Sequence, residues 1–219
     1  MKNLKGKKIL ITAGPTWVAI DSIRVITNIA SGQTGALLAQ KAKRQGAKVT
    51  LVLGPVNTCC LDNAGIRVVN FKFFDELERI LTGELRSKKY HALIHSAAVA
   101  DYRPIKKYPG KVRSNKKKLH LHLVPTPKLV DQIKKVSPHL VTVAFKFEPG
   151  LKGEKLIKAT SLLFRHSRVD MAVANTNAHH RYQAYIVKPP KTIGPLSSKE
   201  KMAEALLKAL GEILGRDTV

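Results

Sequence analysis

Short apolar runs recur along the chain, and most are followed by hydrophobic residues at helical spacing. The apolar runs lie at residues 8–12, 48–53, 66–69, 92–95, 140–144 and 171–174. The helical patterns lie at residues 34–44, 74–85, 127–135 and 153–166. Short strands that alternate with helices are typical of βαβ units. The pattern predicts an α/β fold: a Rossmann-like, mostly parallel sheet with helices on both faces.

Two further segments complete the predicted fold. Residues 197–214 begin with Ser-Ser-Lys-Glu and carry apolar residues at helical spacing, which predicts an amphipathic C-terminal helix. Residues 105–118 are rich in Lys, Pro and Gly and have no apolar period, so we expect an exposed flap. The following Leu119–Leu123 alternates strictly, which predicts a half-exposed strand. We expect a single domain over residues 1–219.

Composition narrows the class of protein. Of the 219 residues, 44% are hydrophobic, and no apolar run approaches the roughly 20 residues that span a bilayer. The basic N-terminus leads into a strand rather than an export signal, so we expect a cytoplasmic location. Cys59 and Cys60 are adjacent, a poor geometry for a disulfide, and His179-His180 lacks further ligands at metal spacing.

The formal charge of +24 requires an anionic partner or a solvated basic surface. Nucleic acid is one candidate, because Lys and Arg neutralise its phosphates. A small phosphorylated substrate is another. Aromatic residues form only 5% of the chain, so platforms for stacking bases are sparse. Charge alone does not choose between these classes.

Three places have residues suited to chemistry. After the first strand, Asn28, Ser31, Gly32 and Gly35 precede or open a helix, whose free N–H groups attract phosphate. After the strand at 92–95, the small residues of Ser96–Asp101 would let a ligand approach the backbone. On the predicted flap, Lys111 and the nearby Arg113 are cations that could cover a triphosphate. Each has an ordinary alternative as a turn, a cap or a solvated lysine.

Read together, these segments resemble the phosphopantothenoylcysteine synthetases (phosphopantothenate-cysteine ligases) in their stand-alone form. The resemblance rests on three ordered motifs: residues 11–16 with 20–35, residues 97–104, and Lys111–Ser114. Thr126-Pro127-Lys128, Phe145-Lys146 and Ala174-Asn175 also fit, so it extends from about residue 8 to the C-terminal helix. No flavin-binding decarboxylase segment precedes these motifs in the sequence, and we expect no flavin.

The resemblance implies a ligase of coenzyme A biosynthesis that joins 4′-phosphopantothenate and L-cysteine. A nucleoside triphosphate with Mg²⁺ would activate the carboxylate as an acyl nucleotidylate. Bacterial members imply CTP, with ATP as the second choice. The family also implies a homodimer, for which the predicted strand Leu119–Leu123 is a candidate interface element. The rival class is a basic nucleic-acid-binding α/β protein. An NAD(P)-dependent oxidoreductase is a weaker rival, because the Gly-rich fingerprint is missing.

The resemblance also implies roles for individual residues. Asn28 and Lys111 would be catalytic, Lys111 in activation and Asn28 in holding the intermediate, and Arg24 and Asn28 would bind substrate. The nucleotide would contact Gly14, Ser31, Gly32, Gly35, Ala97, Ala98, Asp101, Phe145 and Lys146. Trp17-Val18, Ala30 and Gln33 depart from the family pattern, and Gln33 would weaken a phosphate contact.

Overall fold

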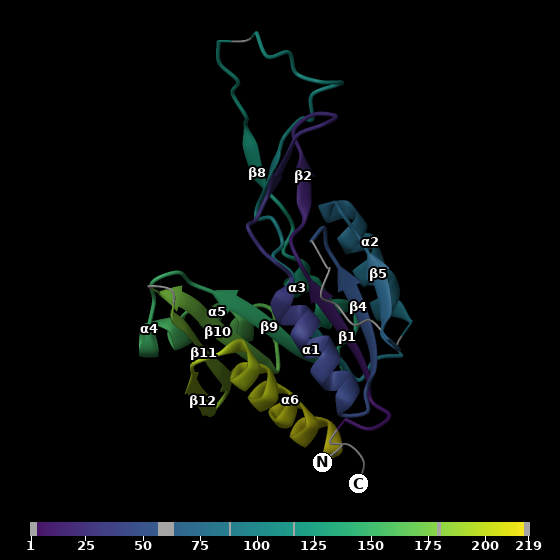
Figure 1. Ribbon diagram of the computed structural model, residues 1–219, viewed down its shortest axis with the longest axis vertical. Coiled ribbons are helices and arrows are strands. Elements are labelled where there is room, and N and C mark those ends of the chain that lie inside the picture. The colour runs from purple at the N-terminus through teal and green to yellow at the C-terminus, as the bar shows by residue number, and fades with distance from the viewer. Residues whose placement is uncertain (1–3, 57–63, 88, 116, 179–180, 217–219) are drawn as a thin grey trace.

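The computed structural model describes residues 4–56, 64–87, 89–115, 117–178 and 181–216 (Figure 1). Cys59, Cys60 and the pair His179-His180 lie outside these residues. Within the described part, eight strands form the central sheet in the order β12-β11-β10-β9-β6-β1-β4-β5. Their bounds are β1 Lys8–Ala13, β4 Lys48–Leu53, β5 Arg67–Asn70, β6 Ala92–His95, β9 Val141–Phe147, β10 Met171–Ala178, β11 Arg181–Lys188 and β12 Lys191–Leu196.

The strands from β10 to β5 run parallel to one another, which confirms the predicted α/β class. The predicted first unit is present as β1, helix α1 (Gln33–Arg44) and β4. The strands β11 and β12 are antiparallel additions at one edge. The sequence pattern did not predict them.

Helices cover both faces of the sheet, as expected (Figure 1). Helices α1 and α6 (Lys199–Arg216) pack on one face, against side chains such as Ile9 and Ile11. Helices α2 (Phe74–Arg86) and α3 (Leu129–Val136) pack on the other, against Leu10 and Leu93. Alternate residues of β1 therefore enter opposite halves of the core, as the period of two in a strand requires.

The single helix predicted over residues 153–166 is two short helices, α4 (Gly153–Lys158) and α5 (Ser161–Arg165). Thr160 separates them: it is 1% exposed, and its Oγ1 donates a hydrogen bond to the carbonyl oxygen of Ile157 at 2.7 Å. A hydroxyl that caps a carbonyl in this way competes with the helical backbone bond. The prediction of one continuous helix was wrong for this reason.

A projecting arm rises from the carboxyl edge of the sheet (Figure 1). We define it as two antiparallel strand pairs and their loops: β2 (Trp17–Ala19) with β3 (Val25–Thr27), and β7 (Tyr102–Pro104) with β8 (Leu123–Pro125). The predicted flap lies in the long loop between β7 and β8. The prediction of a strand over Leu119–Leu123 was wrong, because only Leu123 belongs to a strand. Just before it, the Ile105 N–H donates to the His122 carbonyl oxygen at 2.9 Å.

Asp21 holds the arm together. Its carboxylate is buried and accepts backbone N–H bonds from Ile23 (2.9 Å), Arg24 (2.7 Å) and Val112 (3.0 Å). The Arg24 guanidinium adds an ion pair at 2.5 Å and also donates to the Val112 carbonyl oxygen. Burial would raise the pKa of Asp21, but these donors together hold that pKa well below its usual range. The charged carboxylate thus joins the turn after β2 to the long loop.

His95 is a buried polar residue at the carboxyl end of β6. Its Nδ1 lies 2.8 Å from the Thr12 hydroxyl, which also accepts the Ala97 N–H at 3.3 Å. Burial lowers the pKa of His95 to about 4, so the ring is neutral at pH 7. A neutral ring that accepts the Thr12 hydroxyl hydrogen at Nδ1 carries its own hydrogen at Nε2.

No described helix is long and apolar enough to cross a membrane.

The neutral state of His95 predicts a pH dependence of stability. An unfolded histidine titrates near pH 6.5, above the value of about 4 in the folded chain, so this contribution to stability is present above pH 6.5 and is lost as the pH falls toward 4. The control is His95→Asn, whose amide oxygen can accept the Thr12 hydroxyl hydrogen but does not titrate. Between pH 7 and pH 4 the wild type should lose up to about 3 kcal/mol more unfolding free energy than this variant. Urea unfolding of both proteins at pH 7 and pH 4 measures the difference; parallel pH dependences would contradict it.

Candidate active site

A cavity of about 1060 Å³ opens at the carboxyl ends of the central parallel strands. It extends past the sheet edge on both faces. Gln33, Tyr182 and Lys199 line it on the side of α1 and α6, and His95, Leu129 and Leu163 line it on the side of α3 and α5. Single small-molecule sites commonly have roughly 300–1,000 Å³, so this space suits more than one small ligand.

Glycines let the turn after β1 approach the start of α1. A Cβ on Gly35 would lie 2.4 Å from the Ala13 Cβ and 2.9 Å from the Ser96 Oγ, so no larger residue fits there without a shift. Gly14 and Gly32 have positive φ, of 80° and 71°, which favours glycine. The Ser31 Oγ accepts the Gln33 N–H at 3.4 Å, and the first turn of α1 holds no acid. Because residues 31–35 line the cavity, the N-terminus of α1 is a potential anion site there.

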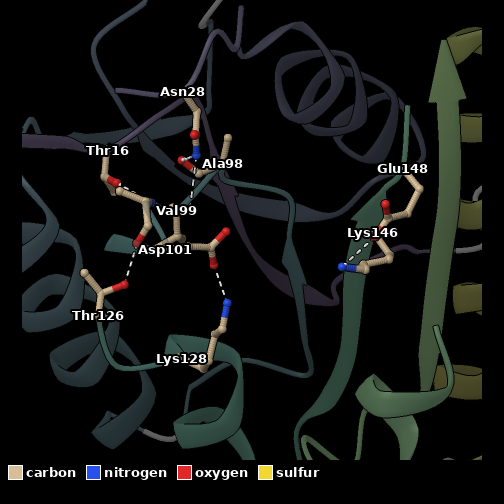
Figure 2. Close-up of polar contacts among 10 residues, drawn as sticks. Thr16, Asn28, Ala98, Val99, Asp101, Thr126, Lys128, Lys146 and Glu148 are labelled. Atoms are coloured by element: carbon tan, nitrogen blue, oxygen red, sulfur yellow. Dashed lines mark hydrogen bonds and ion pairs between the residues drawn. The ribbon is translucent and has the colours of Figure 1, made fainter. Parts of the chain in front are cut away.

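Asn28 and Thr16 hold the segment that follows β6 in place (Figure 2). The Asn28 amide nitrogen donates to the carbonyl oxygens of Ala98 and Val99, each at 3.1 Å. The Ala100 N–H donates to the Thr16 hydroxyl at 2.9 Å. Both amide hydrogens of Asn28 are therefore used, and its Oδ1 keeps an accepting site for a ligand.

The charged groups of the cavity are mostly paired (Figure 2). Lys128 forms an ion pair with Asp101, and Lys146 pairs with Glu148 at 2.9 Å. Lys199 instead donates to the neutral Oε1 of Gln33 at 2.9 Å. Asp101 thus lines the cavity, where the sequence predicted it, and its carboxylate is paired with Lys128.

Most of the predicted site residues come together here. Of the residues that the resemblance implied, the following line the cavity: Gly14, Asn28, Ser31, Gly32, Gly35, Ala97, Ala98, Asp101, Phe145 and Lys146. Arg24 and Lys111 do not; they lie on the arm, Arg24 bound to Asp21 and Lys111 exposed next to Val112. Trp17 packs edge to face on Phe73, with ring centroids 6.0 Å apart.

Sequence reasoning missed several cavity residues. Lys199 and Tyr182 come from the last helix and an antiparallel edge strand, far along the chain from the glycine turn. No local motif marks either residue. His95 ends an apolar strand, and its polarity at a buried position was the available signal.

A metal ion would have few protein ligands at this site. Among the described residues no cluster of three or more His, Cys, Asp or Glu side chains could hold one. Mg²⁺ usually keeps several waters and binds through one or two carboxylates plus substrate phosphates. The carboxylates of Asp101 and Asp131 line the cavity, so the donor set fits a Mg²⁺ ion that arrives with a triphosphate.

The chain has curated relatives of greater length. It is 38% identical over 175 residues to the "Coenzyme A biosynthesis bifunctional protein CoaBC" of Thermococcus kodakarensis, which covers 80% of this chain and 42% of that protein. The chain thus spans less than half of that relative's length.

Solved structures share the fold. A DNA/pantothenate metabolism flavoprotein from Streptococcus pneumoniae superimposes with a TM-score of 0.84 at 22% identity, over 95% of this chain and 100% of that chain. The C-terminal domain of a CoaBC bifunctional protein superimposes with a TM-score of 0.78 at 26% identity, over 99% and 100%. The family model described as "DNA/pantothenate metabolism flavoprotein C-terminal domain" matches residues 4–213. Because that match includes nearly the whole chain, the protein belongs to this family.

Proposed function

We propose that this chain is a phosphopantothenate-cysteine ligase of coenzyme A biosynthesis, that it depends on CTP, and that it acts through an acyl nucleotidylate. One observation carries the proposal. The cavity brings together the Ser31–Gly35 turn, the Ala97–Asp101 segment and Phe145-Lys146, which are distant in the sequence. The family membership and the relative's name, which refers to coenzyme A biosynthesis, support it.

The cavity suits a two-step amide synthesis. In the first step a carboxylate oxygen of 4′-phosphopantothenate attacks the α-phosphorus of the nucleotide, and pyrophosphate leaves. In the second step the amine of cysteine attacks the acyl carbon, loses a proton, and displaces the nucleoside monophosphate. The first step gathers several negative charges, so fixed donors around the phosphates would stabilise its transition state.

The described geometry supports particular roles. The N–H groups of α1 would bind phosphate, and the backbone of Ala97 and Ala98 with Asp101 would contact the rest of the nucleotide. Phe145 would lie against the base. Asn28 would present its Oδ1 to the intermediate, because Ala98 and Val99 hold its amide nitrogen. A Mg²⁺ ion on the triphosphate would neutralise part of its charge.

Lys111 and Arg24 require another explanation, since they lie outside their own chain's cavity. We propose that the protein is a homodimer in which the arm of one copy reaches the cavity of the other. The arm carries apolar side chains that are at least 41% exposed, which suits a contact surface: Ile23, Tyr102, Ile105, Leu119 and Leu123.

Pyrophosphate release tests the function directly. Purified protein with 4′-phosphopantothenate and Mg²⁺ should release pyrophosphate with CTP faster than with ATP, and added cysteine should yield the amide. Faster release with ATP would correct the nucleotide alone. Absence of release with either nucleotide would contradict the ligase.

Lys111→Gln should lower pyrophosphate release by roughly 10²–10³-fold, the usual cost of removing one transition-state stabiliser. Lys107→Gln, on the same exposed loop, is the matched control and should keep the wild-type rate. Equal rates in the two variants would remove Lys111 from the mechanism.

Asn28→Asp should leave pyrophosphate release measurable while slowing amide formation at least roughly tenfold, because a carboxylate at this position repels two carbonyl oxygens and shifts the ligand contact. Separate assays of pyrophosphate and amide give the two rates. An unchanged overall rate would refute the role of Asn28.

Mixing the two variants tests the shared site. If the arms cross, dimers that pair Lys111→Gln with Asn28→Asp contain one intact site, and random reassociation should restore about a quarter of the wild-type activity. Activity equal to the mean of the separate variants would place both residues in one chain's site.

A further inference from the structure

Lys199 is distinguished from the other lysines of the cavity by its partner. Among the described residues three lysines line the cavity: Lys128, Lys146 and Lys199. Carboxylates neutralise the first two. Lys199 donates to the amide oxygen of Gln33, and no described carboxylate lies within ion-pair distance of its ammonium. An amide orients the ammonium without forming an ion pair with it, so Lys199 brings a positive charge to the cavity, with Glu200 in the first turn of the same helix as the nearby acid.

The stability of the helices does not explain a lysine at this place. Lys199 is the first residue of α6, and Gln33, which holds it, is the first residue of α1. Helix N-termini carry partial positive charge, so a cation between two of them is electrostatically unfavourable. Helices α1 and α6 pack side by side, which keeps this charge close to the α1 turn (Figure 1). An anion bound in the cavity would relieve the repulsion.

The same side of the cavity has two buried polar atoms without a hydrogen-bond partner in the described structure. Asn175 and Tyr182 line it from β10 and β11, and in the described structure the buried Asn175 Oδ1 and Tyr182 Oη have no hydrogen-bond partner. Burial raises the pKa of Tyr182, so its hydroxyl remains a donor at neutral pH. Buried polar groups are normally satisfied, and a bound ligand would satisfy these.

We propose that Lys199 is a phosphate-binding residue of this cavity, which Gln33 orients and which acts with the N-terminus of α1 on a phosphate group of the ligand. The inference rests on the proposed function and adds a residue to it. Two substrates of the ligase carry the required chemistry: the nucleotide, through its β- and γ-phosphates, and 4′-phosphopantothenate. The three phosphates of the nucleotide offer the larger negative charge.

Direct binding measurements test this role without requiring turnover. Calorimetric titrations would use inorganic pyrophosphate, CTP, ATP and 4′-phosphopantothenate. Lys199→Met should weaken binding of pyrophosphate and of the nucleotides by roughly ten- to a hundredfold, as expected for loss of one charged hydrogen bond. Lys208→Met, on an exposed position of the same helix outside the cavity, is the matched control and should bind like the wild type.

Gln33→Glu provides a second variant that keeps Lys199 itself. A carboxylate at position 33 would pair with the ammonium that the amide now holds at 2.9 Å, and it should weaken pyrophosphate binding as much as Lys199→Met does. Lys199→Arg keeps the charge and should retain most of the affinity. Thermal unfolding of each variant confirms that the fold is intact.

The outcomes separate the possibilities. Weaker binding of 4′-phosphopantothenate alone would support the phosphate site and assign it to the acid. Unchanged binding of every ligand to folded Lys199→Met would overturn the role of Lys199, even in an active ligase. Lys199-dependent pyrophosphate binding by a wild type that makes no amide would uphold the site and reject the proposed function.

Discussion

The cavity depends on hydrogen bonds that join the chain after β1 to the chain after β6. The Ala98 N–H donates to the Gly14 carbonyl oxygen at 2.9 Å, and the Thr16 N–H donates to the Ala98 carbonyl oxygen at 3.3 Å. These two bonds continue the parallel pairing of β1 and β6 beyond the sheet edge, although the side chains there are small. The α1 turn can then approach Ser96 so closely that only glycine fits at position 35. Without this junction the glycine turn and the Ala97–Asp101 segment would have no fixed relation.

The arm begins at the same junction. Residues 17–27 follow the turn after β1, and residues 102–125 follow the segment after β6. The bonds that shape the cavity therefore also fix the base of the arm. The Thr126 hydroxyl reinforces this base by donating to the Ala100 carbonyl oxygen, and the Thr126 N–H donates to the Asp101 carbonyl oxygen at 2.9 Å. The same hydrogen bonds therefore fix the position of both the cavity and the arm.

Hydrophobic periodicity predicted the parallel core because its strands are short apolar runs with helices between them. β12 was not predicted because this antiparallel edge strand is almost wholly exposed and carries Gly194 and Pro195. β11 is buried over its second half, but no helical pattern separates it from β10 as helices separate the parallel strands. Glycine and phosphate chemistry predicted the turn at Ser31–Gly35. The position of Lys199 in the cavity was not predicted, because it depends on the contact with Gln33, 166 positions earlier in the chain. Tertiary packing alone brings the two residues together.

The position of Lys111 shows how the arm limits the proposed mechanism. A flap that closed over its own cavity would have to carry Lys111 away from Asp21, because Val112, the next residue, is held by that carboxylate and by Arg24. That movement would break the bond from the Val112 N–H, one of the four donors to the carboxylate, and one hydrogen bond to a charged group is typically worth about 1.5–3 kcal/mol. A ligand would have to supply that free energy in every catalytic cycle. If a second copy presents its arm already folded, Asp21 keeps its donors and Lys111 reaches a phosphate without this cost. The donors of one buried carboxylate therefore support the proposed homodimer, in which an intact arm reaches the other subunit, over a flap that closes within one chain.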